Sequence, residues 1–136
     1  MRILLDTHAV LWALAAPGRL PAGVRYAVQS AGNDVFASVA SAWEIAIKVA
    51  LRRLAFDVPS MESTFAASGI QTLGISLQHT ARVAELPLHH RDPFDRMLVA
   101  QALCESMTLV SRDRQLERYG VRMLWREGFP TGSRAP

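Results

Sequence analysis

The segment 92–113, DPFDRMLVAQALCESMTLVSRD, constrains the fold most, because it reads as a helix followed at once by a short buried strand. Pro93 suits the first helical position, where a missing N–H costs nothing, and Asp92 suits the cap before it. The run Thr108–Val110 is β-branched and apolar without polar alternation, which is typical of a parallel strand covered on both faces. A helix leading directly into such a strand indicates an α/β fold.

The same alternation of short apolar strands and helices recurs along the chain. Further strands are expected at 3–5, 35–37, 72–75 and 121–124. Further helices are expected near 8–15, 21–30, 60–68, 77–86 and 115–119, together with a third helix that begins at Ser38 or Ser41 and ends near Leu51. This pattern predicts one domain, residues 1–127, with a three-layer α/β/α sandwich around a mainly parallel sheet of four to five strands. Residues 128–136 are small residues, Pro and Arg, and we expect a mobile C-terminal tail there.

Four carboxylates fall at helix starts or just beyond strands. Asp6 follows the first strand, Glu44 lies near the start of the third helix, Asp95 lies in the first turn of the helix that Pro93 begins, and Asp113 follows the strand at 108–110. In a parallel α/β sheet, the carboxyl ends of the strands and the starts of the following helices share one edge. The topology therefore predicts that these four side chains converge.

Each of these acids also has a purely structural interpretation. Asp6 and Asp113 could be helix N-caps, and Glu44 could close a capping box with Ser41 or pair with Lys48. Together, however, two carboxylates about 5 Å apart repel by about 3 kcal/mol at an effective dielectric near 20, so a cluster of four approaches a small domain's net stability. A divalent cation would relieve this repulsion, and all-oxygen ligands favour Mg²⁺ or Mn²⁺ over zinc.

A carboxylate-bound Mg²⁺ or Mn²⁺ is suited to hydrolysing phosphodiester bonds, and the neighbouring residues agree with that chemistry. Thr7 and Ser111 supply hydroxyls beside the acids, and Arg96 and Arg112 are candidates for phosphate contact. Of the 15 cationic side chains, 14 are arginine. Without the four acids, 8 acidic side chains remain against those 15 cations, a balance that favours binding of a polyanion.

Four motifs occur in order along the chain: LLDTH at 4–8, SAWEIAIK at 41–48, DPFDRMLVAQA at 92–102 and LVSRD at 109–113. They resemble the motifs of PIN-domain ribonucleases and, more narrowly, of the VapC-type toxins of type II bacterial toxin–antitoxin pairs. The resemblance implies a Mg²⁺- or Mn²⁺-dependent endoribonuclease. It also implies that the acidic quartet is Asp6, Glu44, Asp95 and Asp113, with Asp92 as a supporting residue.

The same resemblance implies a homodimer held inactive by a small VapB-type antitoxin, which inserts a segment along helices near the site. Trp12, Trp43 and Leu51 are the apolar residues to examine for that groove, beside ordinary core packing of each tryptophan. Arg52 and Arg53 stand where relatives often place a glycine before a basic residue. We therefore expect the end of the third helix to differ from theirs.

The remaining sequence features favour a cytoplasmic protein without membrane contact. The N-terminus lacks a signal peptide's apolar region, and no apolar run approaches the ~20 residues that span a bilayer. The single cysteine, Cys104, is expected to pack in an apolar helix face. The four histidines lack zinc-ligand spacing, and His89 and His90 are too close in sequence to face one ion.

Two other functions are compatible with the same residues. One is a non-catalytic partner-binding domain of this fold, in which the acids bind an arginine-rich peptide. The other is a DNA-directed, structure-specific nuclease, which would use the same metal chemistry on a different substrate.

Overall fold

A computed structural model describes residues 1–125 of the chain, so the predicted tail at 128–136 lies outside the described residues. Its centre is a five-stranded sheet in the order β3-β2-β1-β4-β5, in which all neighbours are parallel. The strands are β1 (Arg2–Leu5), β2 (Asp34–Ser38), β3 (Ile70–Leu73), β4 (Thr108–Val110) and β5 (Met123–Leu124). The predicted parallel sheet is confirmed.

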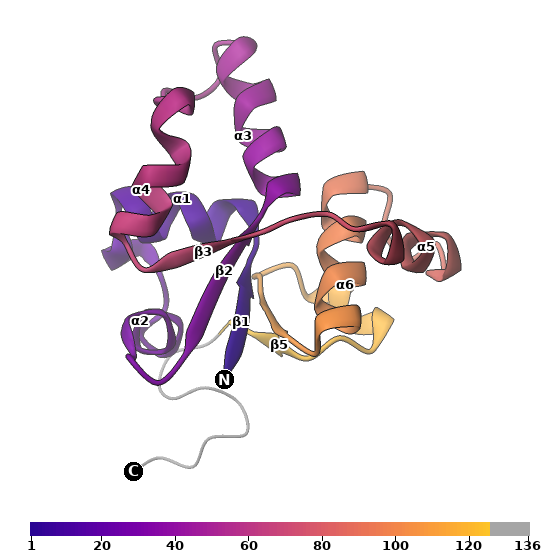
Figure 1. The fold of residues 1–136 in the computed structure, drawn as a ribbon. Coiled ribbons are helices and arrows are strands. Elements are labelled where there is room, and N and C mark those ends of the chain that lie inside the picture. The colour runs from indigo at the N-terminus through magenta and orange to yellow at the C-terminus, as the bar shows by residue number, and fades with distance from the viewer. Residues whose placement is uncertain (126–136) are drawn as a thin grey trace.

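Helices cover both faces of this sheet, with α1, α2 and α4 on one side and α5 and α6 on the other (Figure 1). In β1, Ile3 and Leu5 belong to the core cluster shared with α1 and α2, whereas Leu4 packs in a second cluster with Leu98 and Val99 of α6. The central strand β1 is therefore buried from both faces, which confirms the three layers. The helices are α1 (Thr7–Ala15), α2 (Ala22–Gln29), α3 (Val39–Ala50), α4 (Met61–Ala67), α5 (Leu77–Glu85) and α6 (Pro93–Glu105).

The side on which successive strands join the sheet changes at the central strand, β1. From the central β1, the chain adds β2 and β3 on one side and then returns to add β4 and β5 on the other. Leu5 pairs with Val110, and the N–H of Asp6 donates to the Val110 carbonyl at 3.0 Å. The residues that follow β1 and β4 therefore lie side by side at the carboxyl edge, where open α/β sheets bind ligands.

Several local expectations differ from the structure. β3 starts two residues before the predicted strand, because Gly69 has φ +73° and turns the chain from α4 directly into the sheet. The predicted helix at 115–119 is a 3-10 helix, η3 (Arg114–Tyr119), which ends at Gly120 with φ +78°. Cys104 is exposed instead of packed. None of the helices described is long and apolar enough to span a bilayer.

Candidate active site

Asp6 occupies the centre of the carboxyl edge. It is only 8% exposed, and its Oδ1 accepts the N–H of Ala9 at 2.8 Å, so it is the N-cap of α1. Burial raises the pKa of Asp6 above its usual range, although hydrogen bonds from Ala9 and from the Ser111 hydroxyl oppose that shift. The predicted cap is confirmed, and the same carboxylate also faces the other acids.

Glu44 reaches this edge from α3 and is held through both carboxylate oxygens. Thr7 Oγ1 donates to its Oε1 at 2.5 Å, and Lys48 Nζ lies 3.3 Å from its Oε2, which confirms the ion pair. Ser38 caps α3, so Glu44 lies in the second turn and not in a capping box with Ser41. Ser41 is instead buried, with its hydroxyl 3.1 Å from that of Thr7.

Asp95 lies in the first turn of α6, behind the predicted cap. Asp92 accepts the N–H groups of Phe94 and Asp95 at 2.8 and 3.2 Å, which confirms it as the N-cap. Burial raises the pKa of Asp95 to about 7, and the negative charges of Asp92, Asp6 and Glu44 add to the shift, while His90 opposes it. The structure thus places Asp6 and Glu44 close enough to Asp95 for mutual repulsion.

Asp113 lies on the opposite flank of the site and is connected to Asp95 through a histidine. Its Oδ1 accepts the Gln115 N–H at 3.0 Å as the N-cap of η3, and its Oδ2 lies 2.7 Å from His90 Nε2. The same Nε2 is 3.5 Å from Asp95 Oδ2. One ligand atom from each of His90, Asp95 and Asp113 lies within 4.8 Å of the others. In the described chain, this grouping does not include Asp6 or Glu44.

His90 is the site residue that the sequence analysis missed. The sequence predicts that adjacent histidines do not face one ion, and the two rings do diverge, since His89 packs edge-on against Tyr119 at 5.1 Å between ring centroids. Only His90 turns toward the acids. Its sequence signal was its place two residues before the cap of α6, which brings it to the same edge as Asp95.

The two arginines considered for phosphate contact have different surroundings. The Arg96 guanidinium donates to the carbonyl of Pro87 at 2.9 Å and to the Tyr119 hydroxyl at 3.1 Å, so it ties the start of α6 to the segment after α5. The Arg112 guanidinium lies over the ring of Trp12, 5.5 Å from its centroid. In the described contacts, the Arg112 guanidinium donates to no backbone carbonyl. Of the two arginines, Arg112 is therefore the one that remains a candidate for phosphate contact.

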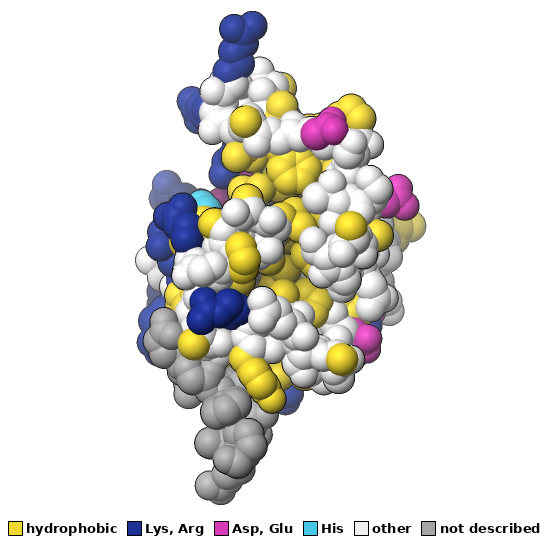
Figure 2. Space-filling model, turned by 90° about the vertical axis from the view of Figure 1, so that its left-hand side faces the viewer, with side chains coloured by type: hydrophobic (Ala, Val, Ile, Leu, Met, Phe, Trp, Pro, Cys, Tyr) yellow, Lys and Arg dark blue, Asp and Glu magenta, His cyan; other side chains and the backbone are white. Residues whose placement is uncertain are grey.

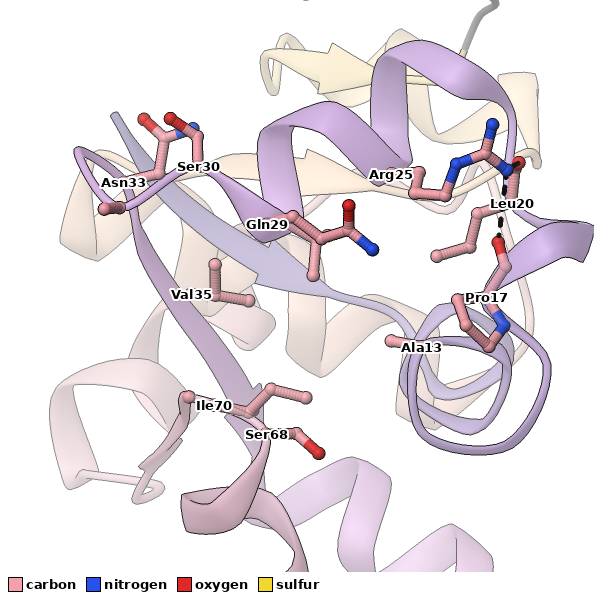
Figure 3. A pocket seen from close by; sticks show the side chains of 13 residues that line it. Ala13, Pro17, Leu20, Arg25, Gln29, Ser30, Asn33, Val35, Ser68 and Ile70 are labelled. Carbon is pink, nitrogen blue, oxygen red and sulfur yellow. Dashed lines mark hydrogen bonds between the residues drawn. The ribbon is translucent and has the colours of Figure 1, made fainter.

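A cavity of about 470 Å³ lies away from the acids. Figure 2 shows hydrophobic side chains lining a hollow on the face that carries α2 and α4, and Figure 3 shows this cavity from close by. It lies against the starts of β2 and β3, near Val35 and Ile70, and is rimmed by Arg25 and Gln29 of α2. Because it borders the amino ends of these strands, it is separate from the carboxyl edge where the acids meet.

The sequence of this domain matches a known family. Residues 3–122 match the family model described as PIN domain. The chain belongs to the PIN-domain family. One relative within it is Ribonuclease VapC22 of Mycobacterium tuberculosis (strain ATCC 25618 / H37Rv), which is 31% identical over 120 residues, covering 86% of this chain and 91% of that protein.

Solved PIN-domain structures share the fold. VapBC2 from Rickettsia felis, bound to a promoter DNA fragment, superposes with a TM-score of 0.69 at 17% identity, over 92% of this chain and 99% of that one. DNA-bound VapBC from Salmonella typhimurium gives 0.64 at 16% identity, over 91% and 97%. At such identities these two comparisons establish the PIN fold, and the chemistry has to be argued from the acids themselves.

Proposed function

We propose that this PIN-domain protein is the toxin of a type II toxin–antitoxin pair and acts as a divalent-metal-dependent endoribonuclease in the cytoplasm. The observation that carries the proposal is the meeting of Asp6, Glu44 and Asp95 at the sheet edge, where burial raises the pKa of both aspartates. The relative named as a ribonuclease supports this activity, and the structural neighbours titled VapBC support the pairing with an antitoxin.

The residues present fit a hard divalent cation. Burial is the main cause of the raised pKa values of Asp6 and Asp95, because it disfavours their ionised forms, and a bound cation would stabilise those forms. The donors are carboxylate oxygens, which favour Mg²⁺ or Mn²⁺. We assign its binding to Asp6, Glu44, Asp95 and Asp113. When bound, such an ion activates water for attack on a phosphodiester and stabilises the leaving oxygen.

Neighbouring residues fix the acids before any substrate binds. The Thr7 hydroxyl orients Glu44, and the Ser111 hydroxyl bonds Asp6 while accepting the backbone N–H of Asp113 at 3.1 Å. Asp92 holds the first turn of α6, so the backbone of Asp95 is fixed. These contacts place the carboxylates at defined positions, which is the protein's main contribution to metal-ion catalysis.

Helix starts and one arginine favour a polyanionic substrate. The N-termini of α1 and α6 both meet the site, and their dipoles favour negative charge there. Arg112, which follows Ser111 at this edge, is our candidate for contact with an RNA phosphate. The same groups would also accept a DNA phosphate, so the experiment below compares the two nucleic acids.

An exposed apolar face lies beside the acids, and we assign it to a second copy of the chain. This face consists of Val39, Trp43 and Ile75, which are 40%, 61% and 39% exposed. Trp43 is therefore not a core residue, and its ring packs edge-on against Phe94 at 5.2 Å between centroids. A pocket of about 340 Å³ continues the face to Met97. Because Trp43 precedes Glu44, a homodimer through this face would place the two sites near one interface.

The cognate VapB-type antitoxin would then neutralise the toxin by covering the carboxylate edge. The guanidinium groups of Arg112 and Arg19 lie over the ring of Trp12, 5.5 and 4.5 Å from its centroid. Trp12 is partly buried against the core, and with the two arginines it forms an aromatic and cationic border beside the acids. Leu51, just after the end of α3, is 57% exposed.

The experiment that tests the proposal uses the purified, antitoxin-free chain with RNA and with single-stranded DNA of the same sequence, in Mg²⁺, in Mn²⁺ and in EDTA. We expect cation-dependent cleavage of RNA that Asp6→Asn and Asp95→Asn abolish. Preferred cleavage of DNA would indicate the DNA-directed nuclease. A folded chain that cuts neither polymer but binds an arginine-rich peptide would indicate the partner-binding domain.

A further inference from the structure

We infer that His90 is a positioning residue that holds the Asp113 carboxylate for the cation, an inference that rests on the proposed metal-dependent function. Its Nε2 lies 2.7 Å from Asp113 Oδ2 and 3.5 Å from Asp95 Oδ2, between carboxylates from two different elements. No other histidine side chain of residues 1–125 joins the grouping of possible metal ligands. This position is compatible with three roles for His90: a metal ligand, a cation that stands in for the metal, or a donor that orients a metal ligand.

The hydrogen bonds of the His90 ring determine which of its two nitrogens carries the proton. The backbone N–H of Asp92 donates to His90 Nδ1 at 3.1 Å, so Nδ1 presents its lone pair and the ring proton is on Nε2. Nε2 therefore donates to Asp113 and has no lone pair to offer a metal. Ligation through Nε2 would require a proton on Nδ1, where it would face the Asp92 N–H. The geometry thus assigns His90 as a donor to a ligand and not as a ligand.

Asp113 is the acid that most needs such a donor. Its side chain is 37% exposed, and apart from its capping bond to Gln115 through Oδ1, the bond from His90 is what fixes Oδ2. The His90 ring is better buried, at 18% exposed, and is anchored to the same Asp92 that caps α6. Through His90, the position of the α6 N-terminus therefore determines the position of the Asp113 carboxylate.

An alternative reading makes the opposite prediction. If His90 were a stand-in cation that neutralises Asp95 and Asp113 until the metal displaces it, its removal would tighten metal binding. If it positions Asp113, its removal weakens metal binding, because ligands that lose their orienting hydrogen bond typically lose about 10- to 100-fold in metal affinity. The sign of the change therefore separates the two roles.

Calorimetric titration of the metal-free full chain with Mn²⁺ measures that sign. We expect His90→Leu to weaken binding about 10-fold or more, and His90→Gln, whose amide N–H₂ can replace the Nε2–H donor, to recover most of it. His89→Leu is the matched control, since His89 contacts Tyr119 and not the acids, and should bind as the wild type does. Unchanged or tighter binding by His90→Leu, or a His90→Gln variant as weak as His90→Leu, would overturn the inference.

A second measurement needs no metal. Long-range ¹H–¹⁵N spectra of the labelled chain, with the His90 signals assigned by their loss in His90→Gln, should show the Nε2–H tautomer. The Nδ1–H tautomer would overturn the inference directly. Wild-type protein that shows the Nε2–H tautomer but binds no Mn²⁺ would instead overturn the proposed metal-dependent function, so the two failures are distinguishable.

Discussion

The hydroxyl of Thr7 lies 2.5 Å from Oε1 of Glu44, which joins the first turn of α1 to the second turn of α3 across the carboxyl edge of the sheet. Thr7 is buried, and Lys48 holds the other oxygen of Glu44 at 3.3 Å. Glu44 is thus oriented from both sides before any cation binds. The orientation of this acid is a property of the fold and not of the bound metal.

Replacing Thr7 tests this orientation. Thr7→Val keeps the shape but removes the donor, and we expect Mn²⁺ affinity and RNA cleavage to fall about 10-fold, as for other residues that orient metal ligands. Thr7→Ser keeps the hydroxyl and should stay near wild type in both assays. Equal behaviour of the two variants would show that the hydrogen bond does not orient Glu44.

Much of this arrangement could be predicted from the sequence, because its determinants are local. Continuous apolar strands followed by helices predict a parallel sheet, and the carboxyl edge then collects Asp6, Asp95 and Asp113. Capping and clustering are alternative interpretations of these acids in the sequence, yet the structure shows both at once: Asp6 and Asp113 cap helices whose N-termini point at the site. The same hydrogen bonds that satisfy the helix ends also fix the acids.

The rest depended on tertiary contacts that no local pattern specifies. The start of α3 was ambiguous between two serines, and only the burial of Ser41 against Thr7 leaves Ser38 as the cap. The role of His90 follows from the path of the loop before α6, which turns two adjacent rings in different directions. The exposure of Trp43 likewise follows from which face of α3 meets the sheet.

The substitution Asp95→Asn distinguishes a metal site from a set of acids that only cap helices. Without metal, the substitution removes the cost of burying the Asp95 charge and its repulsion with Asp92, Asp6 and Glu44, so we expect the variant to be at least as stable as the wild type. Mn²⁺ at 100 times its Kd should stabilise the wild type by about 2.7 kcal/mol and the variant much less. Thermal melts with and without Mn²⁺ measure both effects. A variant destabilised without metal would support a structural role for the carboxylate.

The pKa of Asp95 predicts how the metal-free protein responds to pH. Its pKa is raised from 3.8 to about 7, so between these values the folded chain retains a proton that the unfolded chain has released. The free energy of unfolding of the metal-free protein should therefore fall as pH rises from about 4 to about 7. Denaturant titrations across this range measure the slope, which should be smaller in Asp95→Asn.

Metal binding should show the opposite dependence on pH. Because protons compete with the cation for Asp95, apparent Mn²⁺ affinity should rise by about tenfold per pH unit below 7 and level off above it. Calorimetry between pH 5.5 and 8 tests this expectation. An affinity independent of pH in this range would mean that Asp95 is already ionised without the cation or does not bind it.

The apolar face beside the acids predicts a solution dimer. Trp43→Glu places a charge at the centre of this face, and we expect a monomer by analytical ultracentrifugation. Leu88→Glu is the matched control, because Leu88 is 89% exposed but lines a separate pocket with His89 and Gln115, and it should leave the dimer intact. A Trp43→Glu variant that remains a dimer would place the interface elsewhere.

Anomalous diffraction at the manganese edge, from crystals of the antitoxin-free chain grown in Mn²⁺, tests the central claim most directly. We predict a peak in contact with the four carboxylates assigned above as ligands, those of Asp6, Glu44, Asp95 and Asp113. A chain that cleaves RNA in Mn²⁺ but shows no peak at these carboxylates, or shows one only at other residues, would contradict it.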